Sequence, residues 1–303
     1  MNGFDDLFVK DEEKKKDDNK FQKDDKPFDK DAWVEKKKQE RADAYALIDE
    51  GTEAITQDCE KFRDYLNVQA RFDRYSVSNA ILIAHQMPEA TRLADFDSWK
   101  NNDVSIKKGE AAITILEPGS EYTRGDGTTG FSVNVKKVFD ITQTVDGKAP
   151  KQKNPEQRTA IKALIQTAPC GIEMNNEATK NVLAFYAPDK DTIYIRQGMN
   201  GDDIFRALAQ EIAVAKFAAK DMDRKDCGFY AYCASYILCE RNGFDNGDFN
   251  FDRVPDRFKN MDCKAIRSEL STVRDAVNDI SQEMNRQFEA LEKAARKRDE
   301  PVR

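Results

Sequence analysis

The residues best suited to chemistry in this chain are cations interleaved with aromatic rings in its first half. Binding a nucleic-acid strand without sequence preference needs cations that follow the phosphates and aromatic faces on which bases stack. The cations are Arg71, Arg74, Arg92, Lys107, Lys108, Arg124, Lys136 and Lys137, and the rings are Phe72, Tyr75, Trp99, Tyr122 and Phe131. Alternatively, the rings belong to the core and the cations only face solvent, and the residues alone leave this open.

Metal-dependent hydrolysis has a much weaker basis. The chain has one histidine, His85, whereas a zincin-type site needs two histidines on one helix. The cysteines include no Cys-x-x-Cys pair, and the spacing of Cys227, Cys233 and Cys239 would point them to different sides of a helix. We therefore expect reduced, buried cysteines, a histidine within the core, and neither a metal nor a cofactor.

The elements that position the cations can be predicted from local signals. Ser76 is placed as an N-cap before an apolar run that Pro88 ends, which predicts a helix over 76–87, apolar on nearly every face and therefore buried. A helical pattern precedes it from about residue 31, with Ala46, Leu47 and Ile55 among its apolar residues and a break at Gly51. A short helix over 96–101 carries Trp99.

Alternation of apolar and polar residues predicts strands over 111–117 and 130–142. The glycine-rich loop between them contains Arg124 and is either a clamp for a nucleic-acid backbone or an ordinary hairpin turn.

The second half predicts a helix near 155–167, strands over 182–186 and 192–196, and helices over about 202–220 and 226–242, the last capped by Gly243. An irregular segment follows over 246–260. The final helix, about 263–297, has a heptad-like apolar stripe that suits either docking on the body or pairing with another helix.

Charge and length bound the organisation of the chain. The 303 residues are enough for two domains, and a net charge of −7 argues against strong nonspecific duplex binding but leaves room for a local cationic groove. Residues 1–30 are rich in Asp, Glu and Lys and are predicted to be disordered, and a linker is predicted over 145–156. Without an apolar leader or a membrane-length apolar run, we expect a cytoplasmic protein that does not enter a membrane.

Four blocks, in order, resemble the N-terminal domain of ArdC-like antirestriction proteins, which also occurs in LtrC-like proteins of mobile genetic elements. The matching residues are Tyr75-Ser76, Asn79, Leu82-Ile83, Gln86, Pro88 and Ala90-Thr91, then Trp99, then Lys107 to Glu110 with Ile115-Leu116 and Pro118, then Val138 to Thr144. The resemblance spans roughly 45–145 and implies a single-stranded-DNA-binding domain. The predicted contact residues are Arg71, Arg74, Tyr75, Trp99, Lys107, Lys108, Arg124 and Lys136.

The same family carries a zinc-binding His-Glu-x-x-His helix in its second half, after a strand–turn–strand unit. Here Gln210 and Val214 stand at the two histidine positions, and only Glu211 remains. A glutamine amide is a poor zinc ligand and valine is none, so the resemblance implies the fold of a zincin-like metallopeptidase without its activity.

The resulting prediction is an α+β protein with a helix-plus-antiparallel-sheet DNA-binding domain over 31–148. A degenerate zincin-like domain over 155–260 and a long C-terminal helix over 261–303 follow. Its expected function is single-stranded-DNA binding of the antirestriction type, with the pseudo-metallopeptidase segment as a scaffold or partner-binding surface. The alternative is a protein-interaction module without DNA binding, whose partner would bind the pseudo-metallopeptidase segment or the C-terminal helix.

Overall fold

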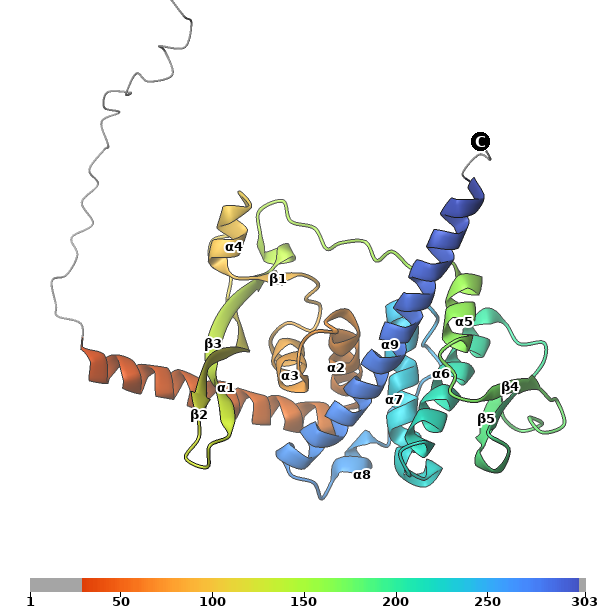
Figure 1. Cartoon of the computed structure of the whole chain (residues 1–303). Helices are drawn as coiled ribbons and strands as arrows, with labels where there is room; N and C mark the ends of the chain where they lie inside the picture. Colours follow the sequence, from red (N-terminus) through yellow and green to blue (C-terminus); the bar gives the residue numbers. More distant parts are fainter. Residues whose placement is uncertain (1–28, 300–303) are drawn as a thin grey trace, which may run out of the picture. The chain divides into compact units, whose positions relative to one another are not determined.

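The computed structural model describes residues 29–299 and has the expected mixed α+β fold (Figure 1). The prediction of a disordered tail over residues 1–30 falls almost entirely outside this range. By its internal contacts the chain divides into a segment that ends at Lys38 and a larger unit that begins at Gln39. The core, the two sheets and the cavities described below belong to the larger unit.

The first half of the chain alternates helices with a small antiparallel sheet. Its elements are α1 (Lys30–Gln57), α2 (Cys59–Arg71), α3 (Val77–Gln86), β1 (Leu93–Ala94), α4 (Phe96–Asn101), β2 (Ile113–Thr123), β3 (Thr129–Asp140) and the 3-10 turn η2 (Ile141–Gln143). The strand order is β1-β3-β2, and Ile113 pairs with Val138 at the base of the β2–β3 hairpin. The predicted hairpin is confirmed, with arms that continue past a register shift between Pro118 and Glu121.

Helix α3 is the core helix that the sequence predicts. The Ser76 side chain caps it by accepting from the backbone N–H of Asn79, and its residues from Val77 to Ala84 are buried apart from Ser78. A helix with apolar residues on all sides can be stable only where other elements cover every face. Here α2 and β2 pack against it, and α9 adds further contacts.

One prediction about α1, the break at Gly51, is wrong. Gly51 does not break the helix, and the buried face follows Ala44, Ile48 and Ile55, while Ala46 is exposed. A Cβ at Gly51 would come within 2.8 Å of Ile81 Cγ2, so the glycine allows α1 and α3 to approach closely. Glycine therefore serves helix packing at this position, and α1 ends only before Asp58, the N-cap of α2.

The second half contains α5 (Gln157–Ile165), β4 (Gly171–Met174), β5 (Ala184–Ala187), the 3-10 turn η3 (Pro188–Lys190), β6 (Thr192–Ile195), α6 (Gly201–Ala218), α7 (Arg224–Asn242), α8 (Val254–Phe258) and α9 (Cys263–Asp299). The second sheet has the order β4-β6-β5, with β4 parallel and β5 antiparallel to β6. The strands at β5 and β6 are confirmed, and β4 and α8 are elements that the sequence did not predict. Gly243 is the αL cap of α7, as expected.

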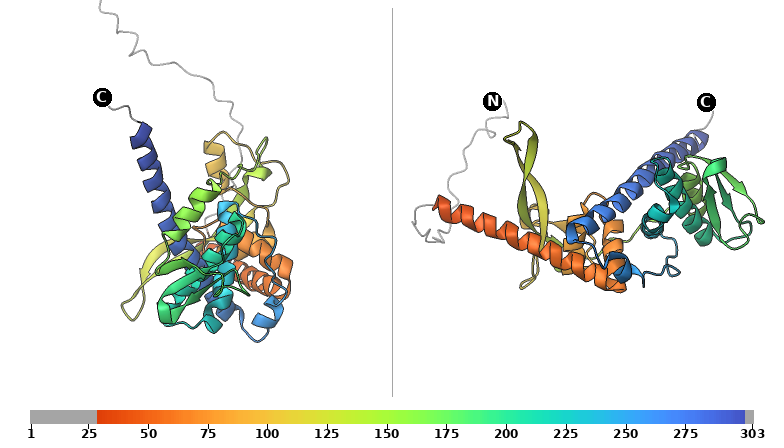
Figure 2. Two further views of the ribbon diagram at one scale, coloured as in Figure 1. Left: turned by 90° about the vertical axis from the view of Figure 1, so that its right-hand side faces the viewer. Right: turned by 90° about the horizontal axis from the view of Figure 1, so that it is seen from below.

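Helix α9 docks on the body of the larger unit. Its stripe from Ile266 to Met284 is buried, and it packs on α5 and α7 with further contacts to α3 and α6. Figure 1 and the right-hand view of Figure 2 show the β2–β3 hairpin and the second sheet at opposite ends of this unit. Of the two uses predicted for the stripe, the structure shows docking.

Within residues 29–299, none of the helices combines the length and the apolar character needed to cross a membrane.

Candidate functional site

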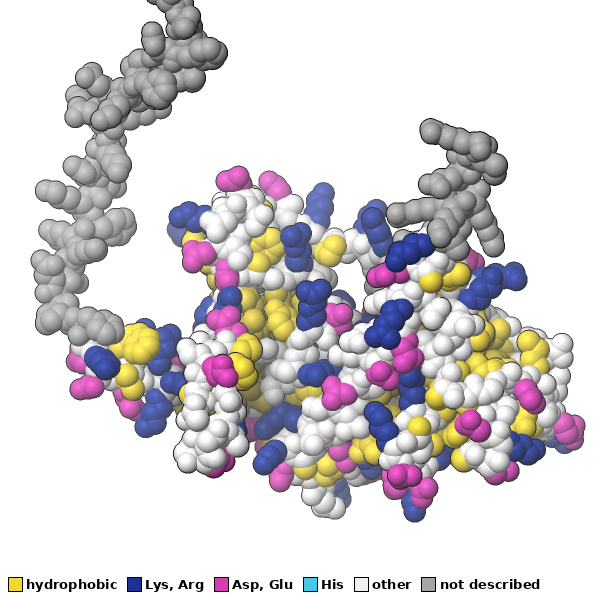
Figure 3. All heavy atoms as spheres, viewed as in Figure 1, with side chains coloured by type: hydrophobic (Ala, Val, Ile, Leu, Met, Phe, Trp, Pro, Cys, Tyr) yellow, Lys and Arg dark blue, Asp and Glu magenta, His cyan; other side chains and the backbone are white. Residues whose placement is uncertain are grey.

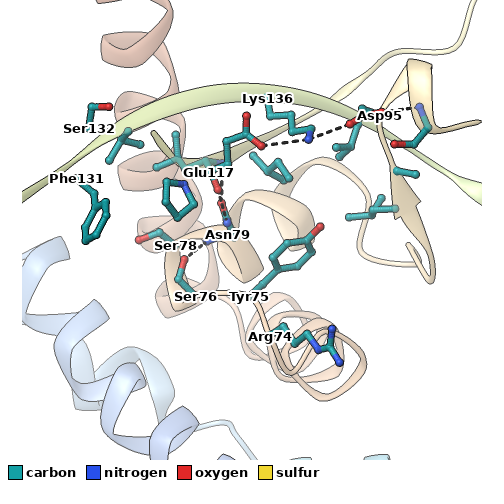
Figure 4. Close-up of a pocket in the computed structure, with 18 of the residues that line it drawn as sticks. Arg74, Tyr75, Ser76, Ser78, Asn79, Asp95, Glu117, Phe131, Ser132 and Lys136 are labelled. Atoms are coloured by element: carbon teal, nitrogen blue, oxygen red, sulfur yellow. Dashed lines mark hydrogen bonds and ion pairs between the residues drawn. The ribbon is translucent and has the colours of Figure 1, made fainter. Parts of the chain in front are cut away.

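A groove of about 830 Å³ opens between α3 and the β2–β3 hairpin (Figure 4). Its lining comes from α1, the turn before α3, the first turn of α3, β1, the start of α4 and both arms of the hairpin. In Figure 3 hydrophobic side chains are visible in the hollow between the hairpin and the helices. The groove is therefore assembled from distant parts of the sequence and has a substantial apolar lining.

Aromatic rings enter this groove from different elements. Tyr45 of α1 is 47% exposed and Phe131 of β3 is 63% exposed. Tyr75 lines the groove just before α3 and is half-buried against Phe72, with the ring centroids 5.5 Å apart. These rings offer open apolar faces to a planar ligand.

The charges in the groove are unevenly paired. Lys136 Nζ lies 2.9 Å from Asp95 and 3.1 Å from Glu117, so two carboxylates offset its charge (Figure 4). The pKa of Asp95 is lowered to about 2, mainly by a hydrogen bond from Ser98 and secondly by the hydrogen bond from Lys136. Arg74 also lines the groove, and among the described residues it has no hydrogen bond or ion pair. It is the cation most available to an anionic ligand.

A second cavity, of about 350 Å³, lies beside α6 and is lined by two residues of the predicted degenerate motif, Gln210 and Glu211. Glu211 is buried, with its side chain 4% exposed, and it forms an ion pair with Arg224 at the start of α7. Its Oε2 also accepts a hydrogen bond from the backbone N–H of Tyr186 in β5 at 2.7 Å. Burial raises the pKa of Glu211, and the adjacent Arg224 guanidinium opposes that shift.

The comparisons with known proteins concern the part of the chain that contains the groove. Residues 43–164 match the family described as the N-terminal domain of anti-restriction factor ArdC. This range includes every residue that lines the groove, from Tyr45 to Val138. Residues 43–164 are therefore an ArdC-like N-terminal domain. The predicted resemblance is confirmed, and no curated protein matches the sequence.

Solved structures extend the likeness to the fold of most of the chain. The chain is similar to the crystal structure of the antirestriction ArdC protein from the R388 plasmid in its Mn(II)-bound form, with a TM-score of 0.56 at 15% identity. That alignment covers 78% of this chain and 98% of the plasmid protein. The metal-free crystal structure of the same protein aligns with a TM-score of 0.47 at 17% identity, over 71% of this chain and 84% of that one.

The residues of this ArdC-like chain do not fit a divalent cation at the predicted motif. Gln210 supplies an amide, Val214 is buried and apolar, and the Glu211 carboxylate is paired with Arg224. The described residues contain no group of three or more His, Cys, Asp or Glu side chains arranged to hold a metal ion. A guanidinium and a backbone N–H therefore balance the Glu211 carboxylate.

The expected core roles of the other reactive side chains are largely as predicted. Cys227, Cys233 and Cys239 are buried, and burial raises the pKa of each thiol. His85 is only partly buried, because it lies near the end of α3, where its Nε2 is 3.6 Å from the carboxylate of Glu50.

The structure places the predicted DNA-contact residues in different surroundings. Arg74, Tyr75 and Lys136 line the groove of the ArdC domain. Arg71 instead points to a separate cavity, donates to the carbonyl of Pro88, and has its pKa lowered by burial. Trp99 is buried at 4% exposure, and its indole N–H donates to the Phe139 carbonyl at 3.0 Å. As it stands, Trp99 has no ring face open for stacking.

The remaining predicted cations lie outside the groove lining. Lys107 donates from Nζ to the Thr142 carbonyl at 2.7 Å, and Lys108 is exposed in the turn that follows. Arg124 lies at the hairpin turn, where its backbone N–H donates to the Thr128 carbonyl. The Lys107 ammonium and the Arg124 guanidinium, which donates to Thr128 Oγ1 at 3.4 Å, each help to hold a turn.

Other groove residues escaped the sequence reasoning. Tyr45 is a large aromatic residue that is exposed although it follows the buried Ala44. The available signal in the sequence was an aromatic residue outside the helical spacing of the buried face of α1. The sequence did not indicate that Asp95 and Glu117 pair with Lys136, because neither their distance along the chain nor their residue type shows that these side chains meet. They matter because they set the charge of the groove.

Proposed function

We propose that this protein binds single-stranded DNA in the groove of its ArdC N-terminal domain, as an antirestriction protein. The observation that carries the proposal is the convergence of exposed rings, Tyr45 and Phe131, with an unpaired cation, Arg74, in one groove of that domain. Strand-binding grooves combine aromatic platforms with cations that follow the backbone. Unpaired bases have free faces and edges, so a single strand suits these platforms better than a duplex.

The test is fluorescence anisotropy with labelled single- and double-stranded oligonucleotides over a range of salt concentrations. We expect the single strand to bind more tightly, with an affinity that falls as salt rises. Tyr45→Ala and Phe131→Ala should each weaken binding by about tenfold, because one stacked base contributes about 1–3 kcal/mol. Tyr122→Ala is the matched control, since Tyr122 is 48% exposed on the same hairpin but does not line the groove.

The absence of binding at low salt would contradict the proposal and turn attention to protein partners. Equal losses of affinity in Tyr122→Ala and Phe131→Ala would show that the binding site lies outside the groove.

We further propose that the Glu211 segment is a catalytically inactive scaffold for the DNA-binding domain. The scaffold role is supported by contacts that join α7 to the end of α2. Arg241 donates to the carbonyls of Gln69 and Ala70 at 3.1 and 3.0 Å, and Tyr236 Oη is 2.8 Å from Asn67. These contacts fix the chain just before the groove residues Arg74 and Tyr75.

Inactivity is tested by adding Mn²⁺ or Zn²⁺ and measuring thermal unfolding. A metal bound with a Kd of about 10 µM would stabilise the folded protein by about 2.7 kcal/mol at about 1 mM metal. We expect no such stabilisation and no peptidase activity. A stabilisation of that size that Glu211→Gln abolishes would contradict the proposal.

A further inference from the structure

The part of the groove that is lined by Asp95, Glu117 and Lys136, called its floor here, is not a phosphate site, although it contains a lysine. Asp95, Glu117 and Lys136 form one hydrogen-bonded chain with a formal charge of −1 (Figure 4). A phosphodiester laid on these residues would meet two carboxylates at close range. Arg74 has no such neighbours bonded to it, so the phosphates belong on its side of the groove and the bases belong on the floor.

The hydrogen-bonding groups on this floor are those that read a base edge. Lys136 Nζ uses two of its N–H groups on the carboxylates of Asp95 and Glu117. Asp95 is largely occupied, because Oδ2 lies against Lys136 and Oδ1 accepts from the backbone N–H of Ser98 at 2.7 Å. Glu117 meets Lys136 through Oε2, and among the described groups its Oε1 has no donor.

The Glu117 carboxylate borders the same groove as the rings. The Glu117 side chain is 41% exposed and lines the groove together with Phe131 and Tyr75. A base held in the groove therefore has a carboxylate acceptor among the groups that line it. Carboxylates accept hydrogen bonds from exocyclic amino groups, as from N4 of cytosine, whereas the O4 of thymine or uracil would face them lone pair to lone pair.

We infer that the groove prefers single strands whose bases carry an exocyclic amino group, and that Glu117 is the residue that sets this preference. The inference rests on the proposed single-strand binding and adds a base selectivity to it. It predicts that cytosine binds better than uracil or thymine at matched length and salt.

The closing experiment compares labelled oligo-deoxycytidine with oligo-deoxyuridine of equal length by anisotropy, at mildly alkaline pH. The two bases differ at the group on C4, which is an amine in cytosine and a carbonyl oxygen in uracil. We expect the cytidine strand to bind the wild-type protein at least about fivefold more tightly, since one good base contact discriminates by about 1–3 kcal/mol.

The variant Glu117→Gln identifies the residue responsible. Its amide can donate as well as accept, so the cytidine-to-uridine affinity ratio should fall toward one even if both strands bind more tightly to the less acidic groove. Glu121→Gln is the matched control, because Glu121 is an exposed residue of the same strand outside the groove, and it should keep the wild-type ratio.

The outcomes separate this inference from the proposed function. Salt-dependent binding of both strands with equal affinity would overturn the base preference and leave single-strand binding standing. A ratio that Glu121→Gln lowers as much as Glu117→Gln does would overturn the assignment to Glu117. If neither strand binds at low salt, both the inference and the proposed function fail.

Discussion

The side-chain amide of Asn79 pairs with the backbone of Leu116 as a neighbouring β-strand would. Its Oδ1 accepts from the Leu116 N–H at 2.8 Å, and its Nδ2 donates to the Leu116 carbonyl at 2.7 Å. Two helical turns later, Gln86 makes the same pair of bonds to Thr114, at 2.9 and 3.0 Å. Helix α3 thereby occupies the outer edge of β2, satisfies its backbone groups and blocks pairing with another strand. This pairing also fixes the hairpin wall of the groove.

Loss of this pairing should destabilise the protein strongly. Asn79→Ala leaves the N–H and carbonyl of Leu116 without partners at a mostly buried site, and each unsatisfied group costs about 1–3 kcal/mol. We expect the free energy of unfolding to fall by about 2–4 kcal/mol in urea titrations, with a similar loss for Gln86→Ala. Gln282→Ala, at an exposed position of α9, should change it by less than about 0.5 kcal/mol. Equal stability of the Asn79 variant and the control would show that the pairing is not needed.

Gly51 gives a prediction with an internal control. In Gly51→Ala the added methyl group would lie 2.8 Å from Ile81 Cγ2, so α1 and α3 must separate. The cost of overpacking, about 1–3 kcal/mol, should exceed the gain of up to about 1 kcal/mol in helix propensity. Gly228→Ala in α7 meets nothing within 4 Å and should therefore raise stability. Thermal unfolding of the two variants should shift in opposite directions, and a shift of both upward would show that the α1–α3 contact is not tight.

The pair of Glu211 and Arg224 should make stability depend on pH in a defined direction. Burial raises the folded-state pKa of Glu211 above its ordinary value of 4.5, and removal of Arg224 raises it further. A raised carboxyl pKa favours folding at low pH, and that advantage is lost as pH rises through the folded-state pKa. Arg224→Met should therefore cost little near about pH 4 and about 1–3 kcal/mol near about pH 8, a range that allows for the partial exposure of Arg224.

The control for this pair is the double variant Glu211→Gln/Arg224→Met, in which no charge remains to titrate at the site. Its unfolding free energy, followed by urea titration at the same pH values, should keep a constant difference from that of Glu211→Gln. A loss in Arg224→Met that does not change with pH would refute an electrostatic role for the guanidinium.

The features that the sequence predicted correctly are local ones. Ser76 and Pro88 bound α3 through capping and steric effects, and both predicted strands of the hairpin are present, although their burial does not alternate strictly, since Thr114 is buried and Phe131 is exposed. These signals depend on residues close together in the chain.

The composition of the groove could not be predicted in the same way, because it depends on contacts between distant segments. Lys136 was expected to meet phosphate, but Asp95, from the start of α4, lies against it. Trp99 was expected to be a stacking platform, but it is buried and its indole N–H donates to the Phe139 carbonyl in β3. Residue type gave the candidates, and tertiary contacts decided which of them face the groove.

The final prediction separates the groove from the other cations. Arg74 has no ion pair among the described residues, so its contact with a phosphate would release a counterion. Arg74→Gln should weaken single-strand binding and lower the slope of log K against log salt by about 0.7, the value for one phosphate contact on a single strand. Lys108→Gln, which removes an exposed cation outside the groove lining, should leave the slope unchanged. Anisotropy titrations at several salt concentrations measure both slopes, and a larger effect from Lys108 would place the backbone of the strand on the turn before β2.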